Sequence, residues 1–345
     1  MRFFQSISAR LVTTAMLVTA FSTAVGAEAT VLQFNRWLPP THFIQSELLE
    51  PWAADVEKAT EGRVRIEMTA SSLGPPARQF DLVRSGVVQM TWSATGYTAN
   101  RFVTGESVEL PFSTTTGEAL SVAYWRVHNE YFAPAREYAG VKLLSLHVQP
   151  PGEIYTTKAA LTKPEDLNGL KIRIPNPATS EVLKAYGGVG VAAPSSKAYE
   201  LLSNGVIDGT FLTLDAVTQF NLTEMINHRM AVEGGFFNAG FYLIMNQNTW
   251  ERLSEADRKA IEDLSGEAFS RRAGRVWDTE AARSQKILDE KGVKTTVLDA
   301  SQTDSIKKKL GGMEEAWIKA VAKKKVDGRA ALDALRGEVA QYRAD

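Results

Sequence analysis

Residues 164–175 read PEDLNGLKIRIP, and this stretch decides most of what the sequence predicts. Its first half is a proline-led turn that ends at Gly169, and residues 170–174 form a short apolar run typical of a strand. Arg173 stands inside that run between Ile172 and Ile174. Because successive side chains of a strand point to opposite faces, the arginine points away from both isoleucines.

The residues alone leave two interpretations of Arg173 open. It is either an edge-strand arginine in solvent or a guanidinium directed at a carboxylate. The second role suits arginine because its planar donors match two carboxylate oxygens and its charge cannot be lost.

Strands and helices alternate on both sides of this stretch. Apolar runs bounded by turn residues predict strands, and apolar residues at helical spacing predict helices. We expect strands at residues 30–34, 64–68, 87–93, 141–147, 170–174, 206–211 and 236–245. We expect helices at residues 43–59, 80–85, 118–138, 181–186 and 198–203, with Pro134 breaking or kinking the third. This alternation favours a layered α/β fold.

A long helical pattern begins after the capping residue Ser254 and continues to Lys291. At 1.5 Å per residue such a helix would be about 57 Å long, which is more than one small domain needs. We therefore expect it to contact two domains. Gly266 and Gly274 are the positions where we expect it to bend.

The composition excludes several classes of protein. The chain has 345 residues, 44% of them hydrophobic, and a formal net charge of −1, which fits a globular protein of two domains. The scattered Lys and Arg residues give no basic patch for nucleic acid. There is no cysteine, so disulfides, thiolate nucleophiles, cysteine zinc sites and iron–sulfur clusters are excluded.

The first residues have the features of a targeting segment. Arg2 and Arg10 precede an apolar stretch at residues 11–25, and small residues fill the end of it at residues 25–27. This pattern predicts a signal peptide at residues 1–27, cleaved on export. The alternative is a membrane anchor, but the run is shorter than the roughly 20 apolar residues that a spanning helix needs. We expect no stable membrane insertion.

Catalytic and metal-binding motifs are absent from the sequence. The four histidines are far apart, and neither a G-x-S-x-G elbow nor a P-loop occurs. We therefore expect no metal, no cofactor and no enzymatic activity.

Four segments carry a resemblance to a known family. They are residues 164–175, the pattern P-x-x-x-x-Y-x-x-L-x-x-G-x-x-D-G at 194–209, LGPPARQFDLVRSG at 73–86 and LSEADRKAI at 253–261. They occur in the expected order and span nearly the whole mature chain. The chain thus resembles the DctP family, the periplasmic substrate-binding proteins of tripartite ATP-independent (TRAP) transporters.

The resemblance implies a two-lobed α/β fold of the periplasmic binding protein type (type II). Crossing strands and a long helix that braces the hinge join the lobes, which close around one ligand. We expect the first lobe to contain residues 28–150 and about 236–278. The second lobe would contain residues 151–235 and about 279–345.

The function implied is that of a monomeric periplasmic receptor, not an enzyme. It would capture a small organic acid by closing its cleft and deliver it to the small and large membrane subunits of the transporter. Two alternatives stay open: a ligand-binding module for a periplasmic sensor, and an exported enzyme with a two-lobed cleft.

The resemblance also implies ligand-binding residues. The strand arginine of the family corresponds to Arg173, which makes it the expected carboxylate-binding residue. Phe211 follows a turn near the cleft, and Trp37 lies in a loop that lines it in the family. Aromatic walls bury ligand area and hold rings by face contact. The remaining candidates for the pocket are Trp92, Tyr97, His147, Asn176 and Arg78.

Glu153 departs from the family pattern. Many members carry a second ligand-facing arginine at the corresponding position. A glutamate there would repel a carboxylate ligand unless that ligand also offers a hydrogen-bond donor or a positive group. The alternative is that the turn at residues 150–152 moves Glu153 out of the cleft. We expect a compact monocarboxylate that also carries a hydroxyl, amino or quaternary group, or an aromatic ring.

Overall fold

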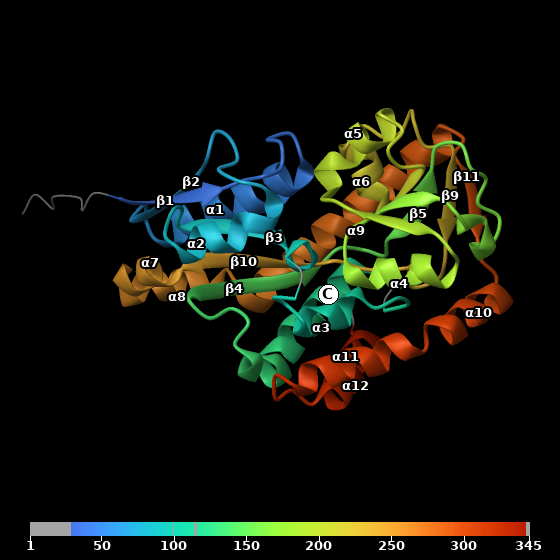
Figure 1. Ribbon diagram of the computed structural model, residues 1–345. Helices are drawn as coiled ribbons and strands as arrows, with labels where there is room; N and C mark the ends of the chain where they lie inside the picture. The colour runs from blue at the N-terminus through green and yellow to red at the C-terminus, as the bar shows by residue number, and fades with distance from the viewer. Residues whose placement is uncertain (1–28, 99, 114–115, 343–345) are drawn as a thin grey trace, which may run out of the picture.

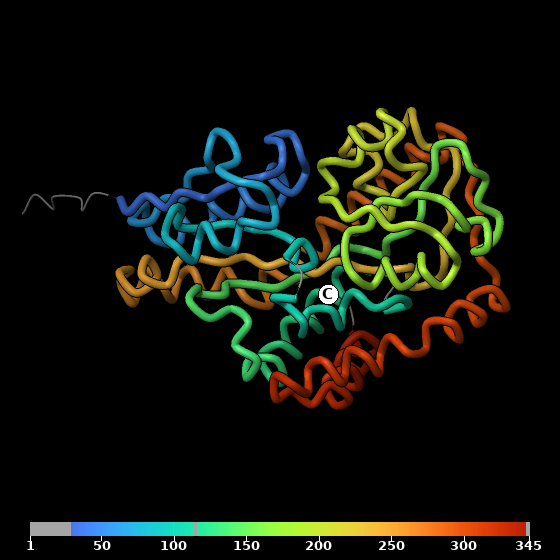
Figure 2. Tube along the Cα trace, viewed as in Figure 1, coloured from blue at the N-terminus to red at the C-terminus, as the bar shows by residue number. Residues whose placement is uncertain are grey.

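The computed structural model describes residues 29–98, 100–113 and 116–342, so the predicted signal peptide lies outside the described residues. Two β-sheets lie side by side, each covered by helices, and the chain passes between them (Figures 1 and 2). The fold is therefore the predicted two-lobed α/β fold.

The first sheet has the strand order β2-β1-β3-β10-β4. Strand β1 pairs in parallel with β2 and β3, whereas β10 pairs antiparallel with β3 and β4. Its strands are β1 (Thr30–Asn35), β2 (Val64–Met68), β3 (Met90–Ala94), β4 (Val141–Val148) and β10 (Gly240–Asn246). Every residue of β3 and β10 is buried, since both strands are central and covered on both faces.

The second sheet has the order β11-β9-β5-β8-β6-β7. Its strands are β5 (Glu153–Thr156), β6 (Lys171–Ile174), β7 (Val189–Ala192), β8 (Gly209–Leu212), β9 (His228–Ala231) and β11 (Lys294–Val297). Strand β6 runs parallel to β7 and β8, and β5 is antiparallel to β8 and β9. The sequence patterns predicted only β6 and β8 of these six strands.

Helices pack around the sheets. The α-helices before the long one are α1 (Glu50–Ala59), α2 (Gln79–Arg84), α3 (Gly117–Val127), α4 (Pro177–Ala185), α5 (Ala198–Ser203), α6 (Leu214–Gln219) and α7 (Gln247–Arg252). The remaining ones are α8 (Glu255–Asp263), α9 (Gly266–Glu290), α10 (Ala300–Leu310), α11 (Gly312–Ala322) and α12 (Gly328–Gln341). Short 3₁₀ and π turns follow β2, β3, α3 and β7, among them η2 (Pro76–Arg78), η3 (Thr95–Tyr97) and η8 (Ser195–Lys197). Helix α3 ends at Val127 and is followed by π and 3₁₀ turns to Ala135, so it is shorter than the predicted helix and ends before Pro134.

Two crossing segments join the sheets, one between β4 and β5 and the other between β9 and β10. They are hydrogen-bonded to each other: the amide of Gly152 donates to the carbonyl of Phe237 at 2.7 Å, and the amide of Phe236 donates to the carbonyl of Gly152 at 2.9 Å. A Cβ atom at position 152 would lie 2.0 Å from the Phe237 ring, so only glycine fits there.

The long helix differs from its prediction in one respect. Ser254 caps α8 as expected, since its Oγ accepts a hydrogen bond from the amide of Asp257 at 3.1 Å. The helical pattern is then broken at Leu264 and Ser265, and α9 starts at Gly266, whose φ is +56°. The predicted single helix is thus divided in two, and the break falls at Gly266, one of the two positions where a bend was predicted, because this glycine adopts the left-handed region. Helix α9 still packs against both β4 and α6, one from each lobe.

Gly274, the other position where a bend was predicted, lies within the continuous helix α9. It lies where α9 crosses α3, and a Cβ atom there would be 2.3 Å from the Cα atom of Glu118. The residue is a glycine because the two helix backbones approach each other closely at this point.

Gly274→Ala is therefore expected to destabilise the protein. The added methyl group meets backbone atoms, so the helices must separate, which costs about 1–3 kcal/mol of unfolding free energy. Urea unfolding measures the change. Gly337→Ala is the matched control, since nothing lies within 4 Å of its added Cβ in α12. That variant is expected to gain about 0.5–1 kcal/mol, and equal effects at both sites would contradict the close crossing.

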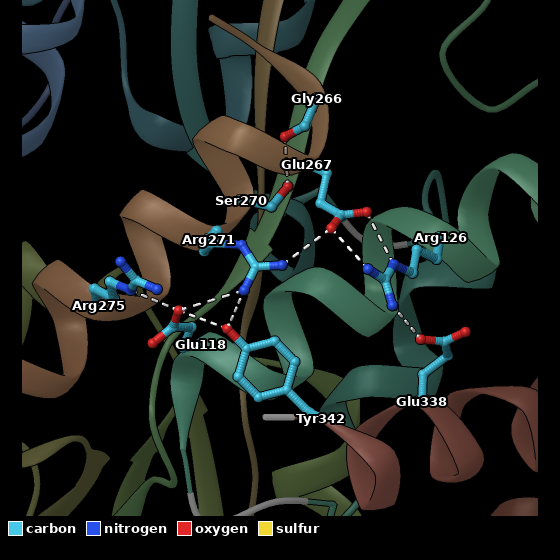
Figure 3. A network of polar contacts seen from close by, with 9 residues as sticks. All are labelled: Glu118, Arg126, Gly266, Glu267, Ser270, Arg271, Arg275, Glu338 and Tyr342. Carbon is cyan, nitrogen blue, oxygen red and sulfur yellow. Dashed lines mark hydrogen bonds and ion pairs between the residues drawn. The ribbon is translucent and has the colours of Figure 1, made fainter. Parts of the chain in front are cut away.

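A polar network joins α12 and the following Tyr342 to α3 and α9 (Figure 3). The hydroxyl of Tyr342 donates to Glu118 at 2.5 Å, and Arg271 donates to that hydroxyl at 2.6 Å. Arg126 binds Glu267 of α9 and Glu338 of α12. Helix α12 also packs on α3, and α3 packs on β4. The division into lobes stays a prediction, but this packing favours placing α11 and α12 with the first lobe.

Candidate functional site

A pocket lies between the two sheets and contains about 550 Å³ of atom-free space, part of it open to solvent. Its aromatic lining residues are Trp37, Trp92, Tyr97, Phe220, Phe237, Phe241 and Trp277. Its polar lining residues are His42, Glu109, Gln149, Arg173, Asn176, Ser195, Thr213 and Asp215. Both sheets contribute, so the pocket is complete only when the lobes are together.

Arg173 lines this pocket from strand β6 and is 1% exposed. Its Nε donates to the carbonyl of Ala193 at 2.7 Å, and its Nη1 donates to the carbonyl of Phe211 at 2.8 Å. Among the described residues, nothing accepts a hydrogen bond from Nη2, and no carboxylate forms an ion pair with the guanidinium. Burial lowers the pKa of Arg173, while Tyr97 beside it raises it. The Arg173 guanidinium is thus a buried cation whose position is fixed by two carbonyls and whose Nη2 can still donate a hydrogen bond. This arrangement favours an anionic ligand.

Trp37, Trp92 and Tyr97 form an aromatic wall. The Trp37 and Trp92 rings stack 5.6 Å apart and 9° from parallel, and Trp37 donates from Nε1 to the Trp92 carbonyl at 2.9 Å. Tyr97 meets Trp37 edge-on at 5.8 Å. Trp92 also stacks on Phe241 at 4.7 Å. Flat, rigid surfaces of this kind bind planar apolar groups.

His147 lies behind the wall rather than among the lining residues. It is fully buried in β4, and its Nε2 accepts a hydrogen bond from the Trp92 indole at 2.6 Å. Burial lowers the pKa of His147 to about 3, so the imidazole stays neutral. The prediction that it contacts the ligand is not supported, because the side chain is used to fix Trp92.

Tyr97 and Asn176 line the pocket and also connect its two sides. The Tyr97 hydroxyl lies 3.1 Å from the Ser195 hydroxyl and accepts from the Ser195 amide at 3.1 Å. Asn176 caps α4 by accepting from the amide of Thr179 at 3.1 Å, and its Nδ2 donates to the carbonyl of Asn238 at 3.2 Å. These bonds link segments that follow β3, β6, β7 and β9, so they span the cleft.

Besides His147, the structure places the side chains of three predicted residues outside the pocket lining, and Glu153 is one of them. Its carboxylate forms a buried ion pair with Arg229, at 2.8 Å from Nη2, and accepts from the Tyr155 hydroxyl at 2.9 Å. It is not among the residues that line the pocket. The expectation that Glu153 selects a positive or donor group on the ligand is therefore corrected: its partner is the protein's own arginine.

Phe211 and Arg78 are the other two. The Phe211 ring packs edge-on against Phe236 and Phe237, and only its carbonyl reaches the site, where it holds Arg173. Arg78 is exposed at the end of η2, away from the lining residues. Neither side chain is placed to contact a ligand.

Six polar lining residues were not predicted from the sequence: His42, Glu109, Gln149, Ser195, Thr213 and Asp215. The aromatic lining residue Trp277 was not predicted either. Burial raises the pKa of Glu109 to about 8 and that of Asp215 to about 7, and it lowers the pKa of His42 to about 3. At neutral pH Glu109 is thus mostly protonated and His42 is neutral. Asp215 is then about half ionised, so Arg173 is the one fully charged side chain of these four, which favours an anionic ligand.

Comparison with known proteins agrees with this arrangement. The sequence model of bacterial extracellular solute-binding protein, family 7 (DctP), matches residues 34–324. The chain belongs to this family. A curated relative, the "Outer membrane transporter protein TsaT" of Comamonas testosteroni, is 31% identical over 97% of this chain and 99% of its own length.

Two solved structures of family 7 proteins resemble this one throughout. A TRAP periplasmic solute-binding protein from Bordetella bronchiseptica holds (R)- and (S)-mandelate; it is 34% identical, with a TM-score of 0.87 over 90% of this chain and 99% of its own. A TRAP solute-binding protein from Rhodoferax ferrireducens holds copurified benzoate; it is 29% identical, with a TM-score of 0.85 over 91% of this chain and 98% of its own.

No helix in the described part of this family 7 chain is long and apolar enough to cross a membrane. Within the same residues, no group of acidic and histidine side chains is arranged to hold a metal ion.

Proposed function

We propose that this chain is the periplasmic receptor of a TRAP transporter and that its ligand is an aromatic monocarboxylate. The observation that carries the proposal is the unpaired Nη2 of Arg173, which is buried at the side of a pocket walled by Trp37, Trp92 and Tyr97. The guanidinium would bind the carboxylate of the ligand, and the stacked rings would pack against its apolar part. Mandelate and benzoate, which occupy the two solved relatives, both have this composition.

The receptor would work by closing its cleft. Contacts across the cleft, such as the hydrogen bonds of Tyr97 with Ser195 and of Asn176 with Asn238, form only when the lobes meet. A ligand held between Arg173 and the aromatic wall adds contacts to that same closed form and so shifts the population towards it. The closed monomer then presents its ligand to the membrane subunits.

A thermal-shift screen of the mature protein tests this proposal. The set includes benzoate, phenylacetate, mandelate, aliphatic hydroxy and keto acids, zwitterions and benzenesulfonate. A ligand at one hundred times its Kd adds about 2.7 kcal/mol to the unfolding free energy, enough to raise Tm by several degrees. We expect the aromatic carboxylates to give the largest shifts. Shifts from aliphatic acids alone would contradict an aromatic ligand, and no shift from any acid would favour the sensor or enzyme alternatives.

A further inference from the structure

Asp215 is a buried carboxylate at the pocket whose oxygens lack partners. It lies at the start of α6, lines the pocket and is 1% exposed. Neither oxygen takes part in a hydrogen bond of ordinary geometry with any described residue. The Thr213 hydroxyl and the amide of Asp215 itself come near enough to lower its pKa, but burial outweighs them. A buried acceptor without a hydrogen-bond donor costs about 1–3 kcal/mol or more of folding free energy. A donor that reached Asp215 would therefore be stabilising.

Two N–H donors line the same pocket. The indole of Trp277 on α9 has no acceptor among the described residues, and its ring lies 5.5 Å from Phe241. The Nδ1 of His42 accepts from the amide of Ile44 at 3.2 Å, so in the neutral ring the proton is on Nε2. The His42 ring is 5.6 Å from Phe220, the residue that follows α6. Helices α6 and α9 pack together, which brings these groups to one side of the pocket.

Arg173 and Asp215 have separate surroundings. The guanidinium is held by carbonyls of residues 193 and 211 and lies beside Tyr97, whereas Asp215 lies near Glu280 of α9. An acid bound through its carboxylate at Arg173 would therefore leave Asp215 and Trp277 unsatisfied unless another polar group of the ligand reached them.

We propose that the ligand carries, besides its carboxylate, a neutral hydroxyl group that donates to Asp215 and accepts from the N–H of Trp277 or His42. This inference rests on the proposed function. A hydroxyl is the fitting group because it has one donor and two acceptor lone pairs, and the site offers one acceptor next to donors. An ammonium group could pair with Asp215 but has no lone pair for the two N–H groups. The ligand class is thus an aromatic hydroxy acid.

Binding measurements on matched acids test the inference. Calorimetry compares benzoate with the three monohydroxybenzoates, and phenylacetate with mandelate and with phenylglycine, its amino counterpart. A site built around a hydroxyl discriminates strongly against the analogue that lacks it. We expect at least one hydroxy acid to bind about 10-fold or more tightly than its parent, the equivalent of about 1.4 kcal/mol.

The protein variants separate Asp215 from the rest of the pocket. In Asp215→Leu the hydroxyl preference is expected to fall below about 3-fold, while the parent acid still binds through Arg173. Asp304→Leu, the same change at an exposed position of α10, should keep the full preference. If the leucine variant does not fold, Asp215→Asn, which conserves the side-chain volume, is tested in its place. Its preference for the hydroxy acid over the parent acid should fall at least 3-fold.

Three results would overturn the inference. One is that no hydroxy acid binds more tightly than its parent, and another is that the preference survives in both Asp215 variants. In the third, phenylglycine binds most tightly and its affinity depends on Asp215, which would mean that the second polar group of the ligand is an amine and not a hydroxyl. In all three the parent acids still bind, so the proposed function stands. If no aromatic acid binds the wild-type protein, the proposed function fails and this inference fails with it.

Discussion

Replacing Arg173 by alanine is expected to weaken the binding of aromatic acids by about 100-fold or more, or about 2.7 kcal/mol. The guanidinium supplies the charge for the carboxylate, and the carbonyls of Ala193 and Phe211 already fix it in the pocket. The alanine variant cannot form the buried, hydrogen-bonded pair between Arg173 and the carboxylate of a bound acid. Calorimetry with benzoate measures the loss of affinity.

The unfolding free energy of the same variant gives a second readout. Without ligand, removing Arg173 takes away a buried charge that has no carboxylate partner among the described residues, but it also removes the hydrogen bonds to the carbonyls of Ala193 and Phe211. Because these two effects oppose each other, the unfolding free energy is expected to change little. Arg78→Ala, at an exposed position, is the control and should bind acids like the wild type. An Arg173→Ala protein that folds and retains affinity within about 3-fold would refute the proposed carboxylate site.

Arg229→Leu is expected to have the largest effect on stability, a loss of about 3–5 kcal/mol. The side chains of Arg229 and Glu153 are each only 10% exposed. Removing the arginine leaves the carboxylate buried, and among the described residues only the Tyr155 hydroxyl still binds it. Urea unfolding of the ligand-free protein measures the loss.

The double variant Arg229→Leu with Glu153→Gln separates charge from packing. Neutralising the stranded carboxylate is expected to recover a large part of the lost stability, since an unpaired buried charge causes most of the cost. Glu153→Gln alone should leave ligand affinity unchanged within about 2-fold, because Glu153 lies outside the pocket lining. A larger change in affinity would restore the idea that Glu153 acts on the ligand.

The α/β alternation and the position of Arg173 in a strand could be predicted from the sequence because their signals are local, whereas the two-lobed fold was implied by the family resemblance. Strand β6 shows its turn, its apolar run and its arginine within twelve residues. The strands missed in the second sheet are four residues long, and they include β7 and β11, which lie at its edges and carry exposed residues. Such short strands give no clear period for a pattern to detect.

The predictions that failed depended on contacts between distant parts of the chain. Glu153 is paired with an arginine 76 positions away, and nothing near it in the sequence shows that partner. Asp215 follows a strand whose residues were expected near the cleft, so extending that expectation by one turn would have found it. The close approach of Gly274 to α3 could not be predicted, because one helix alone does not show a contact with another.

The two walls of the pocket are tethered to each other by the crossing segments around Gly152 and Phe237 and by α9. The tether gives each wall a high effective concentration near the other. Two independent bodies lose several kcal/mol of translational and rotational freedom when they associate, whereas walls tethered in this way have little of that freedom left to lose. Closing the walls then takes little from the contact energy between ligand and pocket, and the main entropic cost left is that of the ligand itself. This economy suits a receptor that collects a dilute solute.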